Sequence, residues 1–147
     1  MNASDKPLYG IGDNTFQAAG GEQGLVALVN NFYDRMSNDR RFARIFQLHR
    51  ADLQSDNMSL TRDKLVAFLS GWMGGPKRYH EQYGSINIPA VHRHLPIGEV
   101  ERDQWLLCMK ESIDEQTYPP AFKAYLMEEL SKPAEMIRRA CQQQTGH

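Results

Sequence analysis

The chain has 147 residues, 41% of them hydrophobic and 24% charged, which fits one globular domain with its own core. Its formal net charge of −1 gives no electrostatic support for nucleic-acid binding, and no apolar stretch approaches the roughly 20 residues of a membrane helix. Two distant cysteines, Cys108 and Cys141, exclude a CxxC zinc or disulfide framework, and the polar start lacks a secretory pattern, so we expect a cytoplasmic protein with reduced thiols.

Hydrophobic periodicity in the first half of the chain indicates helices. The expected elements, in order, are a polar arm over 1–14, a short helix over 15–19, a helix over 22–37, a helical turn over 41–46, a loop over 49–57 and a second strong helix over 59–73. The helix over 22–37 rests on apolar residues at Leu25, Val29, Phe32 and Met36, which share one helical face. Gly74-Gly75-Pro76 is expected to end the helix over 59–73.

The second half of the chain continues the helical pattern. It predicts a mostly irregular stretch over 77–89 with one helical turn at 78–82, a short helix over 90–95, a long helix from 98, another from 121, and a frayed tail over 142–147. Pro133 is expected either to kink the last helix or to divide it. Because nothing alternates with period two and no repeat occurs, we expect an all-α fold with one domain over 1–147.

A search for chemistry leaves one segment that stands out. The chain has no dinucleotide fingerprint, P-loop, nucleophile elbow or HExxH motif, so binding is favoured over a standard catalytic site. His92 and His94 are two residues apart and point to different sides of a helix, so they do not readily hold one metal together. An inward imidazole with Arg93 and Tyr79 nearby would suit a flat apolar ligand that carries carboxylates, and haem is such a ligand. Spacing alone does not decide which histidine faces inward, and a core histidine without a metal is the plainer interpretation.

Two aromatic residues carry a polar group that could serve a bound gas. Tyr33 has a phenol O–H, and Trp105 has an indole N–H that can only donate. Donors aimed at a partly anionic dioxygen would hold it more tightly than an apolar wall. By themselves, such aromatic residues are equally compatible with ordinary core packing.

At this point the sequence resembles the truncated haemoglobins, specifically group II. The resemblance is carried by segments that occur in the family's order between Tyr9 and Ile137: Phe32-Tyr33-Asp34-Arg35-Met36, Leu48-His49-Arg50-Ala51-Asp52-Leu53, Phe68-Leu69-Ser70-Gly71-Trp72-Met73-Gly74-Gly75-Pro76, Arg93-His94-Leu95-Pro96 and Arg102-Asp103-Gln104-Trp105-Leu106-Leu107-Cys108-Met109. The resemblance implies a globin-like two-over-two helical sandwich around haem b, iron protoporphyrin IX.

The family pattern implies roles for individual residues. It makes His94 the iron ligand, rather than His92, because a proline follows two residues later. The other roles it implies are distal donors at Tyr33 and Trp105, further ligand-side residues at Thr61, Leu65, Phe68 and His49, a haem contact at Phe46, and propionate contacts at Arg93 and Tyr79. His49 stands where some members have tyrosine, and Leu65 where some have glutamine, while the loop from Gly84 to His94 is about two residues longer than in the family.

The resemblance leaves two functions open. The first is binding of dioxygen, carbon monoxide or nitric oxide at the haem iron. The second is a redox enzyme at the same iron, acting on peroxide or on nitric oxide and other reactive nitrogen species, with an external electron donor. A haem-free helical interaction module is a third possibility, of another class. His49 is either a surface residue or a sixth iron ligand in the absence of gas.

Overall fold

The structure, a computed structural model, describes residues 9–51, 58–84, 92 and 95–145. Its helices are α1 (Asn14–Ala18), α2 (Gly21–Asn38), the 3₁₀ helix η2 (Arg40–Phe42), α3 (Ala43–Ala51), α4 (Met58–Trp72), α5 (Arg78–Tyr83), α7 (Glu99–Asp114) and α8 (Pro120–Thr145). No strand occurs within these ranges, which confirms the all-α expectation for the described residues. None of these helices combines the length and the apolar run needed to cross a bilayer.

Helix α2 shows how the sequence produces the core. It begins after Gly20, whose φ of 94° is readily adopted only by glycine, and Glu22 lies in its first turn, where the helix dipole favours an anion. Leu25, Val29 and Phe32 recur at steps of four and three and are completely buried. Burying each such side chain contributes about 1.5–3 kcal/mol, so this stripe fixes which face of α2 points inward.

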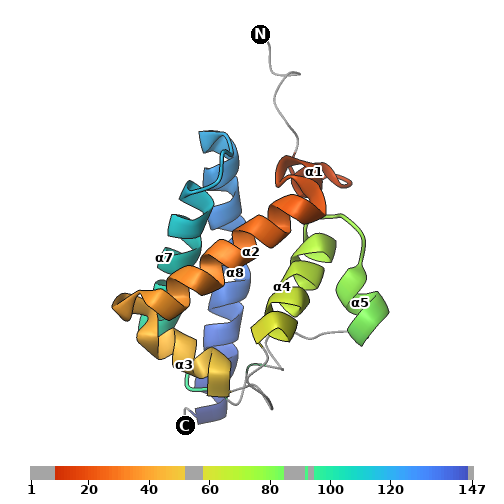
Figure 1. Cartoon of the computed structure of the whole chain (residues 1–147). Helices are drawn as coiled ribbons and strands as arrows, with labels where there is room; N and C mark the ends of the chain where they lie inside the picture. Colours follow the sequence, from red (N-terminus) through yellow and green to blue (C-terminus); the bar gives the residue numbers. More distant parts are fainter. Residues whose placement is uncertain (1–8, 52–57, 85–91, 93–94, 146–147) are drawn as a thin grey trace.

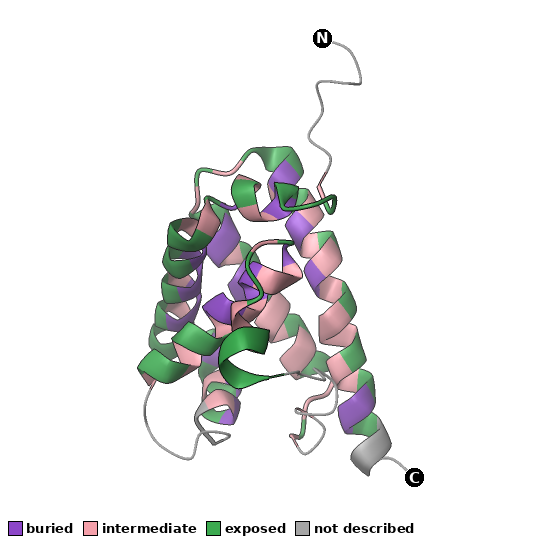
Figure 2. Ribbon diagram, turned by 90° about the vertical axis from the view of Figure 1, so that its right-hand side faces the viewer, coloured by how far each residue is buried: buried purple, intermediate pink, exposed green. Residues whose placement is uncertain are grey.

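The long helices form two layers. Helix α2 packs against α4 and crosses α7, and α7 packs along α8. Figure 1 shows α2 and α4 in front, with α7 and α8 side by side behind them. In Figure 2 the buried residues line the inside of this arrangement, and the outer faces of the helices are exposed.

The glycine turn after α4 fixes the end of that helix. Gly74 has a φ of 86°, and a Cβ there would collide with the carbonyl oxygen of Gly12. The hydroxyl of Ser70 donates to the carbonyl of Pro76 at 2.7 Å, and the amide of Phe16 donates to the carbonyl of Met73 at 3.1 Å. The turn therefore joins the end of α4 to the segment around α1 and stops the helix where the sequence predicts.

Two sequence expectations need correction. His49 was expected in a loop, but α3 continues through Ala51, because Phe42, Ile45 and Leu48 recur every three residues and are buried. Helix α8 runs without division through Pro133 to Thr145, so the tail expected to fray from position 142 is helical up to position 145. Residues 52–57 lie outside the described residues, as does most of the short helix expected over 90–95, of which His92 is described as helical.

Candidate functional site

Tyr33 lies on α2, and its side chain contacts α3. Its side chain is buried, and its ring meets Phe32 edge-on at 5.1 Å and His49 edge-on at 5.7 Å between centroids. Burial raises the pKa of Tyr33 well above its usual value, and the nearby positive charge of Arg62 offsets part of that rise. Tyr33 is therefore a neutral phenol, and thus an O–H donor, throughout the physiological pH range.

Trp105 reaches the same place from α7. Its ring meets Phe32 edge-on, with centroids 5.3 Å apart and planes at 68°. Phe32 is completely buried and contacts both Tyr33 and Trp105, so one phenylalanine joins the two aromatic donors. Edge-to-face contacts of this kind contribute about 0.5–1.5 kcal/mol each and hold the rings in defined orientations. The fold thus brings together two expected site residues that are far apart in the sequence.

His49 lies on α3 with a defined tautomer. Its Nδ1 is 2.7 Å from the carbonyl oxygen of Ile45, one turn earlier in the helix. Because a carbonyl can only accept, Nδ1 carries the hydrogen, and in the neutral ring the lone pair is on Nε2. The ring is half-buried against Tyr33, so His49 is neither a loop residue nor fully exposed.

Helix α4 presents Thr61, Leu65 and Phe68 one turn apart on a common face. All three are half-buried, and Leu65 and Phe68 pack against the core. The Thr61 hydroxyl oxygen is buried and has no hydrogen-bond partner among the residues that the structure describes. An unsatisfied buried hydroxyl costs about 1–3 kcal/mol, so this group is an unused donor in the helix that faces Tyr33.

Tyr79 is placed differently from the other expected residues. It lies half-buried on α5, and its ring contacts Tyr83 at 5.0 Å. Helix α5 is attached to its neighbours by the ammonium group of Lys64, 5.2 Å from the Tyr83 ring centroid, and by an Arg78–Glu22 ion pair of 3.0 Å. Tyr79 thus belongs to the α5 surface rather than to the group around Phe32.

The expected iron ligand His94 and its neighbour Arg93 lie outside the described residues, but both flanks of this pair are described. The carbonyl of His92 accepts hydrogen bonds from the Cys141 thiol at 3.0 Å and from the Leu95 amide at 2.9 Å. The side chain of Cys141 is buried on α8, and burial raises its pKa, so it stays a neutral thiol. Sequence reasoning missed this anchor, because a single cysteine in the last helix has no signal in its spacing.

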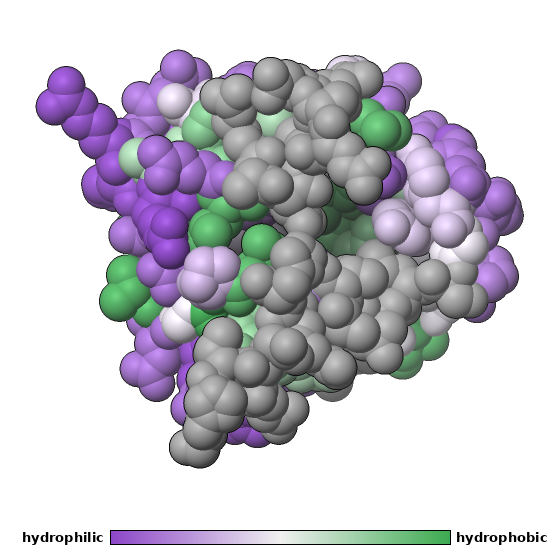
Figure 3. Space-filling view, turned by 90° about the horizontal axis from the view of Figure 1, so that it is seen from below, coloured by the Kyte–Doolittle hydropathy of each residue, from purple (hydrophilic) through white to green (hydrophobic). Residues whose placement is uncertain are grey.

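The described residues suit an apolar planar group. Several large side chains pack against the core and are only partly buried: Phe46, Leu65, Phe68, Trp72, Trp105 and Leu106. Figure 3 shows hydrophobic side chains gathered in the middle of the lower end of the molecule. With the unused hydroxyl of Thr61, these residues provide an apolar wall with few polar groups, which is the chemistry that a porphyrin site requires.

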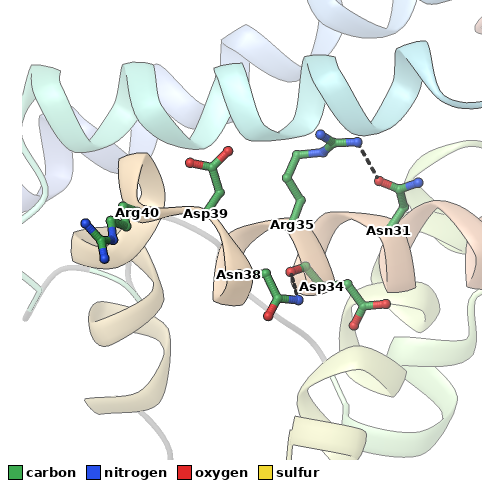
Figure 4. Close-up of a pocket in the computed structure, with 6 residues that line it drawn as sticks. All are labelled: Asn31, Asp34, Arg35, Asn38, Asp39 and Arg40. Carbon is green, nitrogen blue, oxygen red and sulfur yellow. Dashed lines mark hydrogen bonds between the residues drawn. The ribbon is translucent and has the colours of Figure 1, made fainter.

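A separate surface groove does not share that chemistry. It has a volume of about 680 Å³ and is lined, as Figure 4 shows, by polar residues of α2 and the start of η2: Asn31, Asp34, Arg35, Asn38, Asp39 and Arg40. Arg35 points across to α7, where it pairs with Glu111 at 3.4 Å. The charged residues Asp34, Arg35 and Asp39 of this groove pair with Arg62, Glu111 and Arg41, and such mixed charges make the groove unsuitable for an apolar ligand.

The two-layered helical fold with an apolar wall is that of the two-over-two truncated globins. The group II 2-on-2 haemoglobin of Agrobacterium tumefaciens superposes with a TM-score of 0.75 at 27% identity, covering 93% of this chain and 98% of that one. The truncated oxygen-avid haemoglobin of Bacillus subtilis superposes with a TM-score of 0.71 at 28% identity, covering 84% and 97%.

Sequence comparison leads to the same class. The family model for bacterial-like globins matches residues 14–139, and the chain belongs to that family. The group 2 truncated haemoglobin YjbI of Bacillus subtilis is 33% identical over 94 residues, or 64% of this chain and 65% of that protein. The match therefore spans just under two thirds of this curated relative. The cofactor of the chain is haem b, in agreement with the expectation from sequence and with the apolar wall described above.

Proposed function

We propose that the chain binds dioxygen or another diatomic gas at a haem iron held by His94, with Tyr33 and Trp105 as donors to the ligand. The observation that carries the proposal is the contact of both aromatic rings with the same buried Phe32, which sets two donors from different helices against one wall. The Bacillus subtilis structural relative is described as oxygen-avid, which supports a site built to retain oxygen.

Each residue of the proposed site has a separate role. When bound, the haem supplies a ferrous iron that binds the gas. The phenol of Tyr33 and the indole N–H of Trp105 donate to a ligand with partial negative charge, and the Thr61 hydroxyl is available as a third donor. Leu65 and Phe68 exclude water from the ligand, which strengthens these hydrogen bonds and slows oxidation of the iron. We assign Arg93 and Tyr79 to the propionates, and Phe46 to the haem edge.

The absorption spectrum of the purified protein tests the haem proposal. We expect a Soret band and visible bands that change when carbon monoxide is added to the reduced protein. A colourless protein that gains no Soret band when haem is supplied would instead support a haem-free interaction module. His94→Ala should greatly weaken haem retention, and His92→Ala is the matched control, expected to retain haem. Equal loss from both variants, or loss from His92→Ala alone, would contradict the assignment.

One observation favours a redox enzyme as the second candidate. With Nδ1 2.7 Å from the Ile45 carbonyl oxygen, the imidazole of His49 is held against Tyr33, and a histidine at such a position can act as a proton acceptor for peroxide. This activity, or oxidation of nitric oxide, would require an external electron donor. Peroxidase turnover measured beside oxygen dissociation and autoxidation rates separates the two functions, and His49→Ala should reduce peroxide turnover if this second function holds. A very slow oxygen dissociation rate would argue against simple transport.

A further inference from the structure

Arg62 connects α4 to α2 directly beside Tyr33. Its Nη1 donates to the Asn30 side-chain oxygen at 3.0 Å, and its Nη2 donates to an Asp34 carboxylate oxygen at 2.8 Å. Its guanidinium carbon lies 5.8 Å from the centre of the Tyr33 ring. Arg62 therefore contacts the helix that carries the proposed donor, while its own backbone follows Thr61, the residue with the unused hydroxyl.

The arrangement suits positioning better than stability. The two acceptors, Asn30 and Asp34, are one helical turn apart on α2, and the planar fork of an arginine can donate to both at once. The Asp34 side chain is 62% exposed, and ion pairs at such exposure contribute little to stability, usually below about 1 kcal/mol. The two hydrogen bonds of Arg62 do, however, fix the position of α4 relative to α2 at the level of Tyr33 and Thr61.

We propose that Arg62 is a positioning residue, which holds Tyr33 in the geometry needed to donate to the ligand and increases the donor strength of the Tyr33 hydroxyl. This inference rests on the proposed ligand-binding function. The electrostatic part agrees with the 5.8 Å contact, because the charge of Arg62 lowers the pKa of Tyr33 against the larger effect of burial, and a more acidic phenol is a stronger donor. A displacement of the donor oxygen by about a tenth to a few tenths of an ångström is enough to change the strength of its hydrogen bond.

The test uses the haem-loaded full chain and four variants: Arg62→Met, Arg62→Lys, Tyr33→Phe and the double variant Arg62→Met/Tyr33→Phe. The oxygen dissociation rate and the infrared stretching frequency of bound carbon monoxide are measured for each. We expect Arg62→Met to raise the dissociation rate about three- to tenfold, within the range of coupling between contacting residues, and to move the stretch to higher wavenumber. Arg62→Lys retains the positive charge but lacks the planar guanidinium that donates to both acceptors. Its dissociation rate and carbon monoxide stretch should therefore lie between those of the wild type and Arg62→Met.

The double variant identifies the path of the effect. If Arg62 acts through Tyr33, Arg62→Met should change little once the phenol is gone. Full additivity of the two changes would overturn the proposal, and so would an Arg62→Met protein with wild-type dissociation and stretch. Asp34→Ala, which removes one of the two acceptors, provides the same test by a smaller change if Arg62→Met does not fold; wild-type values for Asp34→Ala would then also overturn the proposal.

A matched control separates this role from general stabilisation. Arg41 also joins two elements, because it pairs with Glu111 of α7 at 2.8 Å, but its contacts within the described residues are with Asp39, Glu111 and the Phe42 ring rather than with Tyr33. Arg41→Met should lower the unfolding midpoint without changing either ligand measurement. If Tyr33→Phe itself leaves both measurements unchanged, the donor role in the proposed function fails; if Tyr33→Phe changes them and Arg62→Met does not, only the present inference fails.

Discussion

Replacing Trp105 with phenylalanine isolates one hydrogen bond in the proposed ligand site. Phenylalanine keeps an aromatic ring against Phe32, where the indole now makes an edge contact at 5.3 Å, but it removes the N–H. A hydrogen bond to a charged partner is worth roughly 1–3 kcal/mol, and about 1.4 kcal/mol corresponds to a tenfold change in rate. Trp105→Phe should therefore accelerate oxygen dissociation by roughly 5- to 150-fold.

The assay is displacement of oxygen by carbon monoxide, followed by stopped-flow absorption. Trp105 is only half-buried, so the smaller ring should lower the free energy of unfolding by about 1–2 kcal/mol, and a denaturant titration checks this separately. Tyr118→Phe is the control, since it removes a different aromatic donor, whose hydroxyl bonds to the Ala19 carbonyl at 2.8 Å away from the site. An unchanged dissociation rate in Trp105→Phe would refute the reasoning and leave Tyr33 or another group as the donor that retains the ligand.

Three further predictions follow from the site, the glycine turn and the buried phenols. His49→Ala should abolish any six-coordinate low-spin spectrum of the gas-free protein, and a spectrum that persists would assign the sixth ligand to another group. Gly74→Ala should lower the free energy of unfolding by about 2–4 kcal/mol in urea titrations, because it adds a steric clash to an unfavourable positive φ. Gly84→Ala is the matched control, because Gly84 has a similar φ of 84° but open space around it. This second substitution should lower the free energy of unfolding by about 1 kcal/mol. Burial raises the pKa of Tyr33 above the ordinary 10.0, and it raises the pKa of Tyr118 to about 12. The contribution of both phenols to stability is therefore complete below pH 10 and falls as the pH rises from 10 toward 12. Urea unfolding midpoints measured from pH 7 to 11 that do not fall above pH 10 would contradict this prediction.

Local pattern was sufficient for most of the fold. The apolar stripe of α2 and the glycine turn after α4 are encoded by neighbouring residues, so periodicity and turn chemistry predict them. The loop expected at His49 is wrong because Ile45 and Leu48 continue the helical spacing through this polar segment. Pro133 left two outcomes open, and burial of Leu130 and Ala140 on either side favours a continuous helix.

The supporting contacts of the site could not be predicted in this way. Arg62 reaches an acceptor 28 residues away, and the Cys141 thiol reaches a carbonyl 49 residues away. Neither residue type carries a motif, and each contact joins segments that only the fold brings together. Chemistry and family resemblance predict Tyr33 and Trp105 as ligand donors, but their shared contact with Phe32 is visible only in three dimensions.

The thiol of Cys141 also has a consequence for assembly. It donates to the carbonyl of His92 from the later turns of α8, so this helix is tied to the residue that stands two positions before the proposed iron ligand. A protein in which α8 is not yet docked would lack this contact. We therefore expect stable haem capture to depend on docking of α8 as well as on the residues that would meet the haem.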